Sequence, residues 1–181
     1  MNHDELQAVM DGARRLYNEQ QITDAIAELA VRINEQLAGT VPLVFCVMNG
    51  GVIFTGHLAP KLNFPLQLEY LHATRYREQM SGADLQWRVK PSVSLTGRTV
   101  LILDDIFDEG ETLARIYEWC REQGATEVLT AVLVDKQHDR KRASIRNADF
   151  TALYAEDKYL FGYGMDYKGF LRNAPGIYAI D

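Results

Sequence analysis

The chain has 181 residues, with 47% hydrophobic side chains, 24% charged side chains and a net charge of −6. This length suits one domain with a sizeable core, and the composition excludes an intrinsically disordered protein. Because the net charge is negative, neither nucleic acid nor an anionic membrane is an expected partner.

The first half of the chain alternates between helical and strand patterns. Between residues 22 and 37 apolar side chains recur at steps of three and four, which predicts a helix that ends near Gly39. The apolar run over residues 41–48 predicts a buried strand, and the glycine turn after it leads into a second helical pattern over residues 52–62. A further strand is expected over residues 66–73.

A polar segment over residues 74–92 then interrupts the apolar pattern. It reads as a long mobile hairpin, and loops of this length inside compact domains are usually functional lids or disordered segments. Taken alone, it is equally compatible with a surface hairpin of no function.

No segment has the pattern of a membrane span or a secretory leader, because the N-terminus is polar and the apolar runs are short. We therefore expect a cytoplasmic protein. Cys46 and Cys120 are expected to be buried, reduced thiols, since they have no metal-ligand spacing. The four histidines lack such spacing too and are assigned no chemistry.

The stretch VLILDDIFDEGETL, over residues 100–113, joins a predicted buried strand to a predicted helix that ends near Gly124. Another buried strand is expected over residues 128–134, and two more strands over residues 149–154 and 158–164. Apolar strands that alternate with helices predict a mostly parallel sheet covered on both faces. In such sheets, ligands bind at the carboxyl ends of the strands.

The acids that follow the apolar run at residue 103 are typical of a site for a sugar phosphate or for magnesium. Like charges placed this close repel each other, so water or a cation has to compensate them. Gly110 and the helix N-terminus offer backbone N–H groups to an anion, and Thr112 adds a hydroxyl. The alternative is that the acids only stabilise the helix N-terminus, which suits Glu109 and Glu111 best.

This stretch resembles the phosphoribosyl pyrophosphate signature of the type I phosphoribosyltransferases, and the whole chain is similar to the hypoxanthine-guanine members of that family. The resemblance implies the α/β fold of the family: one domain over residues 1–181, with a mostly parallel central sheet flanked by helices. It also implies a small hood, formed by the N-terminal helix and the C-terminal tail, and a flexible active-site loop over about residues 74–92.

The resemblance assigns roles to the acids of the signature. Asp104 and Asp105 are implied to hold the ribose hydroxyls and Mg²⁺, and Asp108 to accept the proton from purine N7. The 5-phosphate is implied to lie in the loop formed by Asp108, Glu109, Gly110, Glu111 and Thr112.

The pyrophosphate leaving group is implied to contact a loop after the first strand, together with more distant residues. Its implied contacts are Met48, Asn49, Gly50, Gly51, Tyr76 and Arg172. The family also implies a non-proline cis peptide near Met48-Asn49, and Asp166 as the ligand of a second Mg²⁺. Asn49 departs from the Lys or Arg of many members, and Arg75 from their Ser. Without the resemblance, the loop is a plain glycine turn, and Asp166 with Arg172 is an ordinary surface ion pair.

The purine is implied to bind Lys136, Tyr159 and Leu160. The Lys136 ammonium can only donate, so it suits the O6 acceptor of hypoxanthine or guanine and not the 6-amino group of adenine. Tyr159 is implied to stack on the base, and the Leu160 backbone to bond its far edge. The alternative for Lys136 is a solvated lysine at a strand end, and the alternative for Tyr159 is a core aromatic residue.

The function that the resemblance implies is Mg²⁺-dependent transfer of 5-phosphoribosyl from phosphoribosyl pyrophosphate to N9 of hypoxanthine or guanine. The products are IMP or GMP and pyrophosphate, in purine salvage, and the implied assembly is a homodimer or homotetramer. A regulator that kept the fold as a ligand sensor, without turnover, is the alternative. A receiver domain is disfavoured because its acid pair lies near the N-terminus. A P-loop nucleoside triphosphatase is disfavoured because the chain has no Gly-Lys dipeptide.

Overall fold

The computed structural model describes residues 1–75, 85–141 and 144–180 of the chain. Tyr76, an expected pyrophosphate contact, lies outside the described residues. The main sheet has six strands in the order β4-β3-β2-β5-β6-β7, and every neighbouring pair is parallel except β3 and β4. Its strands are β2 (Leu43–Val47), β3 (Gln67–Arg75), β4 (Leu85–Val89), β5 (Thr99–Phe107), β6 (Glu127–Gln137) and β7 (Phe150–Glu156). The prediction of a mostly parallel sheet is confirmed.

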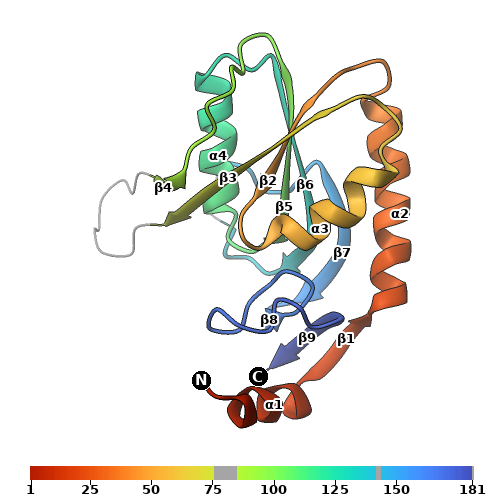
Figure 1. Ribbon diagram of the computed structural model, residues 1–181, viewed down its shortest axis with the longest axis vertical. Coiled ribbons are helices and arrows are strands. Elements are labelled where there is room, and N and C mark those ends of the chain that lie inside the picture. The colour runs from red at the N-terminus through yellow and green to blue at the C-terminus, as the bar shows by residue number, and fades with distance from the viewer. Residues whose placement is uncertain (76–84, 142–143, 181) are drawn as a thin grey trace.

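Helices cover both faces of this sheet, with α2 and α3 on one face and α4 on the other (Figure 1). The helical segments are α1 (His3–Gly12), α2 (Glu19–Gln36), α3 (Gly51–Leu58), α4 (Glu111–Glu122) and the short 3₁₀ helix η1 (Ala59–Lys61). The longest, α2, begins at a capping box between Asn18 and Gln21 and turns the predicted apolar stripe toward the sheet. Within the described parts of the chain, no helix is long and apolar enough to cross a bilayer.

The sheet separates two apolar cores, and strand β5 contributes to both. Leu101 and Leu103 point into the core with α2 and α3, whereas Val100 and Ile102 point into the core with α4. This alternation follows from the two-residue period of a strand. Cys46 and Cys120 are buried free thiols, as predicted, and burial raises the pKa of Cys120 to about 12.

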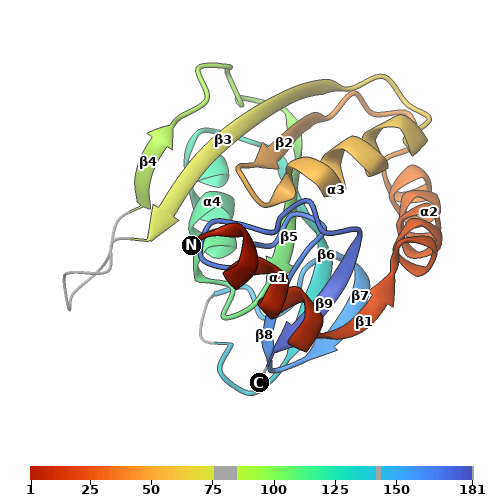
Figure 2. The same cartoon turned by 60° about the horizontal axis from the view of Figure 1, so that its bottom comes forward.

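A second, smaller sheet forms the hood. Its strands are β1 (Arg14–Asn18), β8 (Tyr159–Phe161) and β9 (Gly176–Ile180), in the antiparallel order β1-β9-β8. Figures 1 and 2 place it beyond the carboxyl ends of the main strands, with α1 beside it. The long helix α2 packs on the main sheet instead. The hood is therefore built mainly by β1 near the N-terminus and by β8 and β9 near the C-terminus, and not by a helix alone.

Two predicted boundaries are wrong. Asp104 and Asp105 do not follow β5 but lie within it, because pairing with β6 continues as far as Phe107 and Asp135. Strand β6 likewise continues past the predicted end at residue 134, and Lys136 is its second-last residue. The expected hairpin over residues 74–92 is confirmed at its two borders, because β3 and β4 pair antiparallel; residues 76–84 between them lie outside the described residues.

The hood touches the main sheet through a loop in which glycine is required. Gly164 has φ of +110°, and a Cβ atom there would collide with the backbone oxygen of Gly50, at the start of α3. The Asp105 side chain lies close to the same point. The loop from β8 to β9 therefore reaches the strand acids only because residue 164 has no side chain.

We predict that Gly164→Ala destabilises the protein by more than about 1 kcal/mol, since neither the φ angle nor the space accepts a methyl group. The measurement is the urea dependence of unfolding. Gly56→Ala is the matched control, because nothing lies within 4 Å of its Cβ and the residue sits in α3. It should be neutral or stabilising by about 0.4–1 kcal/mol. Equal midpoints for the two variants would contradict the proposed hood contact.

Candidate active site

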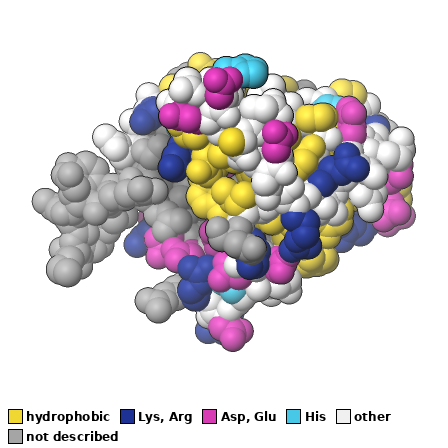
Figure 3. All heavy atoms as spheres, turned by 90° about the horizontal axis from the view of Figure 1, so that it is seen from below, with side chains coloured by type: hydrophobic (Ala, Val, Ile, Leu, Met, Phe, Trp, Pro, Cys, Tyr) yellow, Lys and Arg dark blue, Asp and Glu magenta, His cyan; other side chains and the backbone are white. Residues whose placement is uncertain are grey.

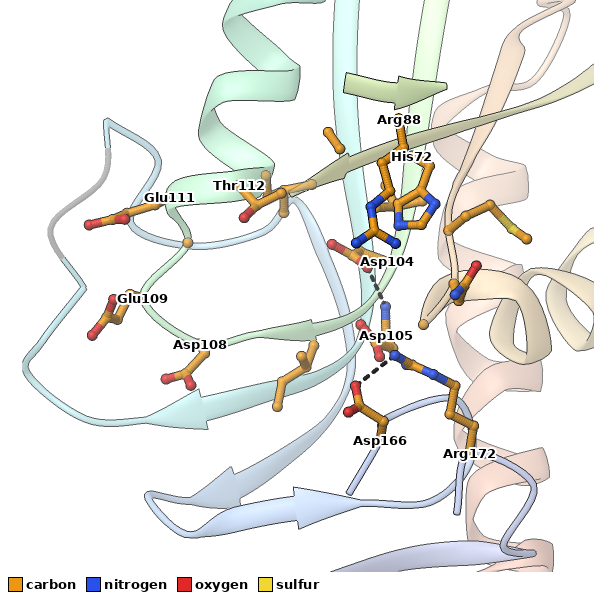
Figure 4. Close-up of a pocket in the computed structure, with 18 residues that line it drawn as sticks. His72, Arg88, Asp104, Asp105, Asp108, Glu109, Glu111, Thr112, Asp166 and Arg172 are labelled. Atoms are coloured by element: carbon orange, nitrogen blue, oxygen red, sulfur yellow. Dashed lines mark hydrogen bonds and ion pairs between the residues drawn. The ribbon is translucent and has the colours of Figure 1, made fainter. Parts of the chain in front are cut away.

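A pocket of about 500 Å³ opens at the carboxyl ends of the main strands (Figure 4). It is bordered by the loop after β2, the acidic end of β5, the turn into α4 and the hood loop. Its lining residues include Met48, Asn49, Gly50, His72, Arg88, Asp104, Asp105, Asp108, Glu109, Gly110, Glu111, Thr112, Asp166 and Arg172. The structure thus brings together most of the residues that the sequence assigned to the sugar phosphate and to pyrophosphate.

Asp104 and Asp105 form a buried acid pair on the pocket floor, and each residue is only 9% exposed. Burial raises the pKa of both carboxyls, and the Asp105 charge raises that of Asp104 further. The positive charge of Arg172 acts against these effects on both. Asp104 Oδ1 accepts a hydrogen bond of 2.9 Å from the Asp105 backbone N–H. In Figure 4, Asp104 faces His72 and Arg88, and Asp105 faces Asp166 and Arg172.

The turn into α4 has the geometry of an anion site. Gly110 is the N-cap residue with φ of +79°, and a Cβ there would lie 2.6 Å from the Phe107 ring. The first N–H groups of a helix have no partner within the helix, and the helix dipole adds partial positive charge. Thr112 also lines the pocket. A phosphate group fits these donors.

Glu109 and Glu111 would weaken anion binding if their carboxylates entered this turn. Figure 4 shows both side chains extending away from Thr112 and the acid pair. Glu109 lies 3.7 Å from the Arg140 guanidinium. Their backbone can therefore border an anion while their charges stay outside the pocket.

The loop after β2 contains the expected cis peptide between Met48 and Asn49, which is confirmed. Asn49 supplies no charge. Arg172 is fixed in the hood loop by hydrogen bonds of 2.6 Å to the Gly164 carbonyl and to Asp166 Oδ1. The other Asp166 oxygen accepts from the Gly169 N–H at 2.7 Å. The expected ion pair of Asp166 and Arg172 is thus part of the pocket wall.

A second group of charges surrounds Asp108. Lys136 Nζ lies 3.2 Å from Asp108 Oδ2 and 3.2 Å from Asp157 Oδ1, and His138 Nε2 lies 2.7 Å from Asp108 Oδ1. The Lys136 side chain is only 9% exposed, so the alternative of a solvated lysine is wrong. Burial alone would raise the pKa of Asp108, but the hydrogen bonds from His138 and Lys136 outweigh it and lower the pKa. Asp108 is therefore ionised at neutral pH and able to accept a proton.

Tyr159 and Leu160 lie in β8, in the hood. The Tyr159 side chain is half exposed, and its hydroxyl donates to the Asp166 carbonyl at 3.2 Å. Leu160 is buried and pairs with Ala179 of β9. None of the three expected purine contacts is among the described residues that line the pocket. Lys136, however, contacts Asp108, which lines it.

Residues 12–167 match the family model of the phosphoribosyl transferase domain. The chain belongs to the phosphoribosyltransferase family. It is 30% identical over 163 residues to the hypoxanthine-guanine phosphoribosyltransferase of Bacillus subtilis (strain 168), covering 90% of this chain and 89% of that relative. It is 29% identical over 170 residues to the hypoxanthine-guanine-xanthine phosphoribosyltransferase of Tritrichomonas foetus, covering 93% and 92%.

Solved structures agree with this assignment. A hypoxanthine-guanine-xanthine phosphoribosyltransferase superposes with a TM-score of 0.85 at 27% identity, covering 94% of this chain and 99% of that one. The Trypanosoma cruzi hypoxanthine phosphoribosyl transferase superposes with a TM-score of 0.84 at 26% identity, covering 93% and 91%. The type I phosphoribosyltransferase fold expected from the sequence is therefore confirmed.

Four residues of this phosphoribosyltransferase site were missed by the sequence analysis: His72, Arg88, His138 and Asp157. Arg88 enters the pocket from β4, inside the segment expected as a mobile hairpin, and His72 enters from β3, where a strand was expected. Burial and the charges of Arg88 and Arg172 lower the pKa of His72, which favours its neutral form. His138 lies two residues after Lys136. Because side chains two residues apart in an extended chain point to the same side, this spacing could have indicated that His138 lies near Lys136.

The pocket offers oxygen ligands to a divalent ion from two directions, the acid pair of β5 and Asp166 of the hood loop. Carboxylates are the ligands that Mg²⁺ prefers, and the ion takes only one or two of them while keeping waters. A different group, Asp108, His138 and Asp157, has atoms within 4.8 Å of one another. There, however, the Lys136 ammonium already lies against both carboxylates.

We predict that Asp104→Asn makes the folded protein more stable at pH 7. Burial raises the pKa of Asp104 above its unfolded value, so wild-type stability falls as pH rises through the folded-state pKa. The variant lacks this penalty, and its advantage should vanish as pH falls to the ordinary Asp pKa of about 3.9. The measurement is urea unfolding at both pH values. The control is Asp24→Asn, at an exposed position of α2. A variant that is less stable by the same amount at both pH values would contradict the buried-charge account.

Proposed function

We propose that this phosphoribosyltransferase transfers a 5-phosphoribosyl group from phosphoribosyl pyrophosphate to N9 of hypoxanthine or guanine, giving IMP or GMP and pyrophosphate. The observation that carries the choice of base is Lys136. Its buried ammonium is held by Asp108 and Asp157 beside the turn that suits a phosphate. A fixed donor next to an ionised carboxylate matches a 6-oxopurine, which offers an acceptor at O6 and a proton at N7.

The sugar and its phosphate fit the acid pair and the turn into α4, next to Lys136. The turn from Asp108 to Thr112 offers backbone donors to the 5-phosphate, and the acid pair offers acceptors to the ribose hydroxyls. A hydroxyl group can donate to a carboxylate, which compensates part of the charge buried in β5. The proposed ligand therefore provides partners for the two buried carboxylates.

The pyrophosphate would lie against the cis-peptide loop and Arg172. Gly50 lines the pocket there, whereas Gly51 packs against the Leu103 backbone oxygen of β5. The family implies a divalent metal, and we propose Mg²⁺, with one ion held through Asp104 and Asp105 and a second held through Asp166. When bound, such an ion withdraws charge from the leaving oxygens. Arg88, on the Asp104 side of the pocket, supplies a positive charge that Asn49 does not.

The proposed reaction forms the bond from purine N9 to ribose C1 as the bond from C1 to the pyrophosphate oxygen breaks. The N7 proton passes to the Asp108 carboxylate, which is ionised and lines the pocket. Lys136 has three N–H donors, and the two acids occupy two of them. The third remains for purine O6. Tyr159 would stack on the base, with the backbone of Leu160 at its far edge.

We also propose that the protein is cytoplasmic and acts as a homodimer or homotetramer. Leu68 and Tyr70 support self-association, because they lie on one face of β3 and are 51% and 52% exposed. Nucleic acid and membranes are not proposed partners. On the face in Figure 3, Lys and Arg side chains are interspersed with Asp and Glu and form no continuous basic stripe.

The test is a set of initial rates with hypoxanthine, guanine, xanthine and adenine at fixed phosphoribosyl pyrophosphate and Mg²⁺. We expect turnover with hypoxanthine or guanine, and adenine to be at least about a hundredfold poorer in kcat/KM, because a buried Lys136 cannot accept a hydrogen bond from an amino group. Removing the metal with a chelator should abolish turnover, and adding Mg²⁺ back should restore it.

Two outcomes would overturn the proposal. Efficient use of adenine without use of any 6-oxopurine would contradict the role of Lys136. Binding of phosphoribosyl pyrophosphate with no nucleotide formed from any of the four bases would instead favour a ligand sensor on the same fold.

A further inference from the structure

His138 is a buried side chain whose orientation is set from both sides. Its ring is only 5% exposed, and it follows β6 by one residue. Nδ1 accepts a hydrogen bond of 3.1 Å from the Arg140 backbone N–H. Because a backbone N–H can only donate, the proton of a neutral ring has to be on Nε2. Nε2 lies 2.7 Å from Asp108 Oδ1, so the ring donates to that carboxylate.

Each oxygen of Asp108 thus has its own donor. His138 holds Oδ1 at 2.7 Å, and Lys136 holds Oδ2 at 3.2 Å. Both donors are fixed by β6, since Lys136 lies in this strand and His138 directly follows it. They leave the carboxylate little freedom to rotate, although the Asp108 side chain is 39% exposed. The carboxylate therefore keeps one plane while its outer lone pairs remain open to the pocket.

The charges around this contact come from several elements. Lys136 lies in β6, Asp157 follows β7, and Arg140 follows β6. Arg140 contacts both oxygens of Asp157, at 2.7 and 2.8 Å, and lies 3.7 Å from Glu109. The positive charges of Lys136 and Arg140 are thus matched by three acids. His138 is the one member of the group that can hold Asp108 without adding a charge.

We propose that His138 is a positioning residue for the transfer reaction: its neutral ring fixes the Asp108 carboxylate so that one Lys136 donor stays available to the purine. This inference rests on the proposed function. The proton passes from purine N7 to Asp108 and not onward to His138, since Nε2 already carries a proton and Nδ1 is occupied by the Arg140 N–H. It leaves Asp108 through the exposed side of the carboxylate.

A metal site at Asp108, His138 and Asp157 is a weaker explanation of the same geometry. A divalent ion there would face the Lys136 ammonium, which lies 3.2 Å from both carboxylates. Like charges at such separation repel strongly in a partly buried site. The lysine already supplies the positive charge that the two acids require.

The test compares His138→Ala, His138→Gln and the exposed control His3→Ala in the full chain. We expect His138→Ala to lower kcat by about ten- to a hundredfold, the range for loss of a hydrogen bond to a charged group. Loss of this donor raises the pKa of Asp108, so the acidic limb of the kcat/KM profile for hypoxanthine should move to higher pH. KM for phosphoribosyl pyrophosphate should stay unchanged. His138→Gln keeps a donor and should restore most of both properties.

A second readout does not depend on turnover. The carboxyl carbon of Asp108, followed by ¹³C NMR, should titrate at higher pH in His138→Ala than in wild type, and His138→Gln should return toward wild type. An unchanged Asp108 titration in His138→Ala would overturn the inference. So would a His138→Gln variant as impaired as His138→Ala with a changed KM for phosphoribosyl pyrophosphate, which indicates general damage to the loop. Absence of nucleotide formation by wild type would refute the proposed function alone, because the titration still tests the contact.

Discussion

The constraint on which the site depends is the burial of two neighbouring carboxylates inside a paired strand. Asp104 and Asp105 lie in β5, which stays bonded to β6 past both of them. Charges without partners are costly to bury, and here burial raises the pKa of both groups. Three glycines allow the backbone to pack closely around them: Gly50 and Gly51 at the start of α3, and Gly164 in the hood loop. The pocket is therefore shaped around two carboxylates that favour the binding of hydroxyl groups and of cations.

The acids of the site work in two different environments. The pair in β5 is buried against apolar residues, and its pKa values are raised, whereas Asp108 has two donors, and its pKa is lowered. Environments that shift the pKa values of neighbouring carboxyls in opposite directions are typical of catalytic sites with distinct acid and base roles. The first group suits binding of a sugar and a metal. Asp108 suits proton transfer at neutral pH.

The sequence predicted the features that depend on local pattern. The apolar stripe of α2, the buried strands and the glycine turn into α4 all follow from periodicity and backbone geometry. Spatial partners were harder to predict. Strand β1 is five residues long, and its burial does not alternate: two exposed residues are followed by three half-buried ones. It was therefore not recognised as part of the hood. The sequence places His138 two residues after Lys136, but only the fold shows that its ring reaches Asp108.

The central claim is that one pocket exchanges pyrophosphate for a 6-oxopurine on the same ribose carbon. ³¹P NMR of a mixture of the protein, phosphoribosyl pyrophosphate, Mg²⁺ and hypoxanthine tests it directly. We predict that the phosphorus signals of the substrate are replaced by equal amounts of pyrophosphate and a nucleotide 5-phosphate. No change in the substrate signals, or conversion to free ribose 5-phosphate and pyrophosphate without nucleotide, would contradict the account.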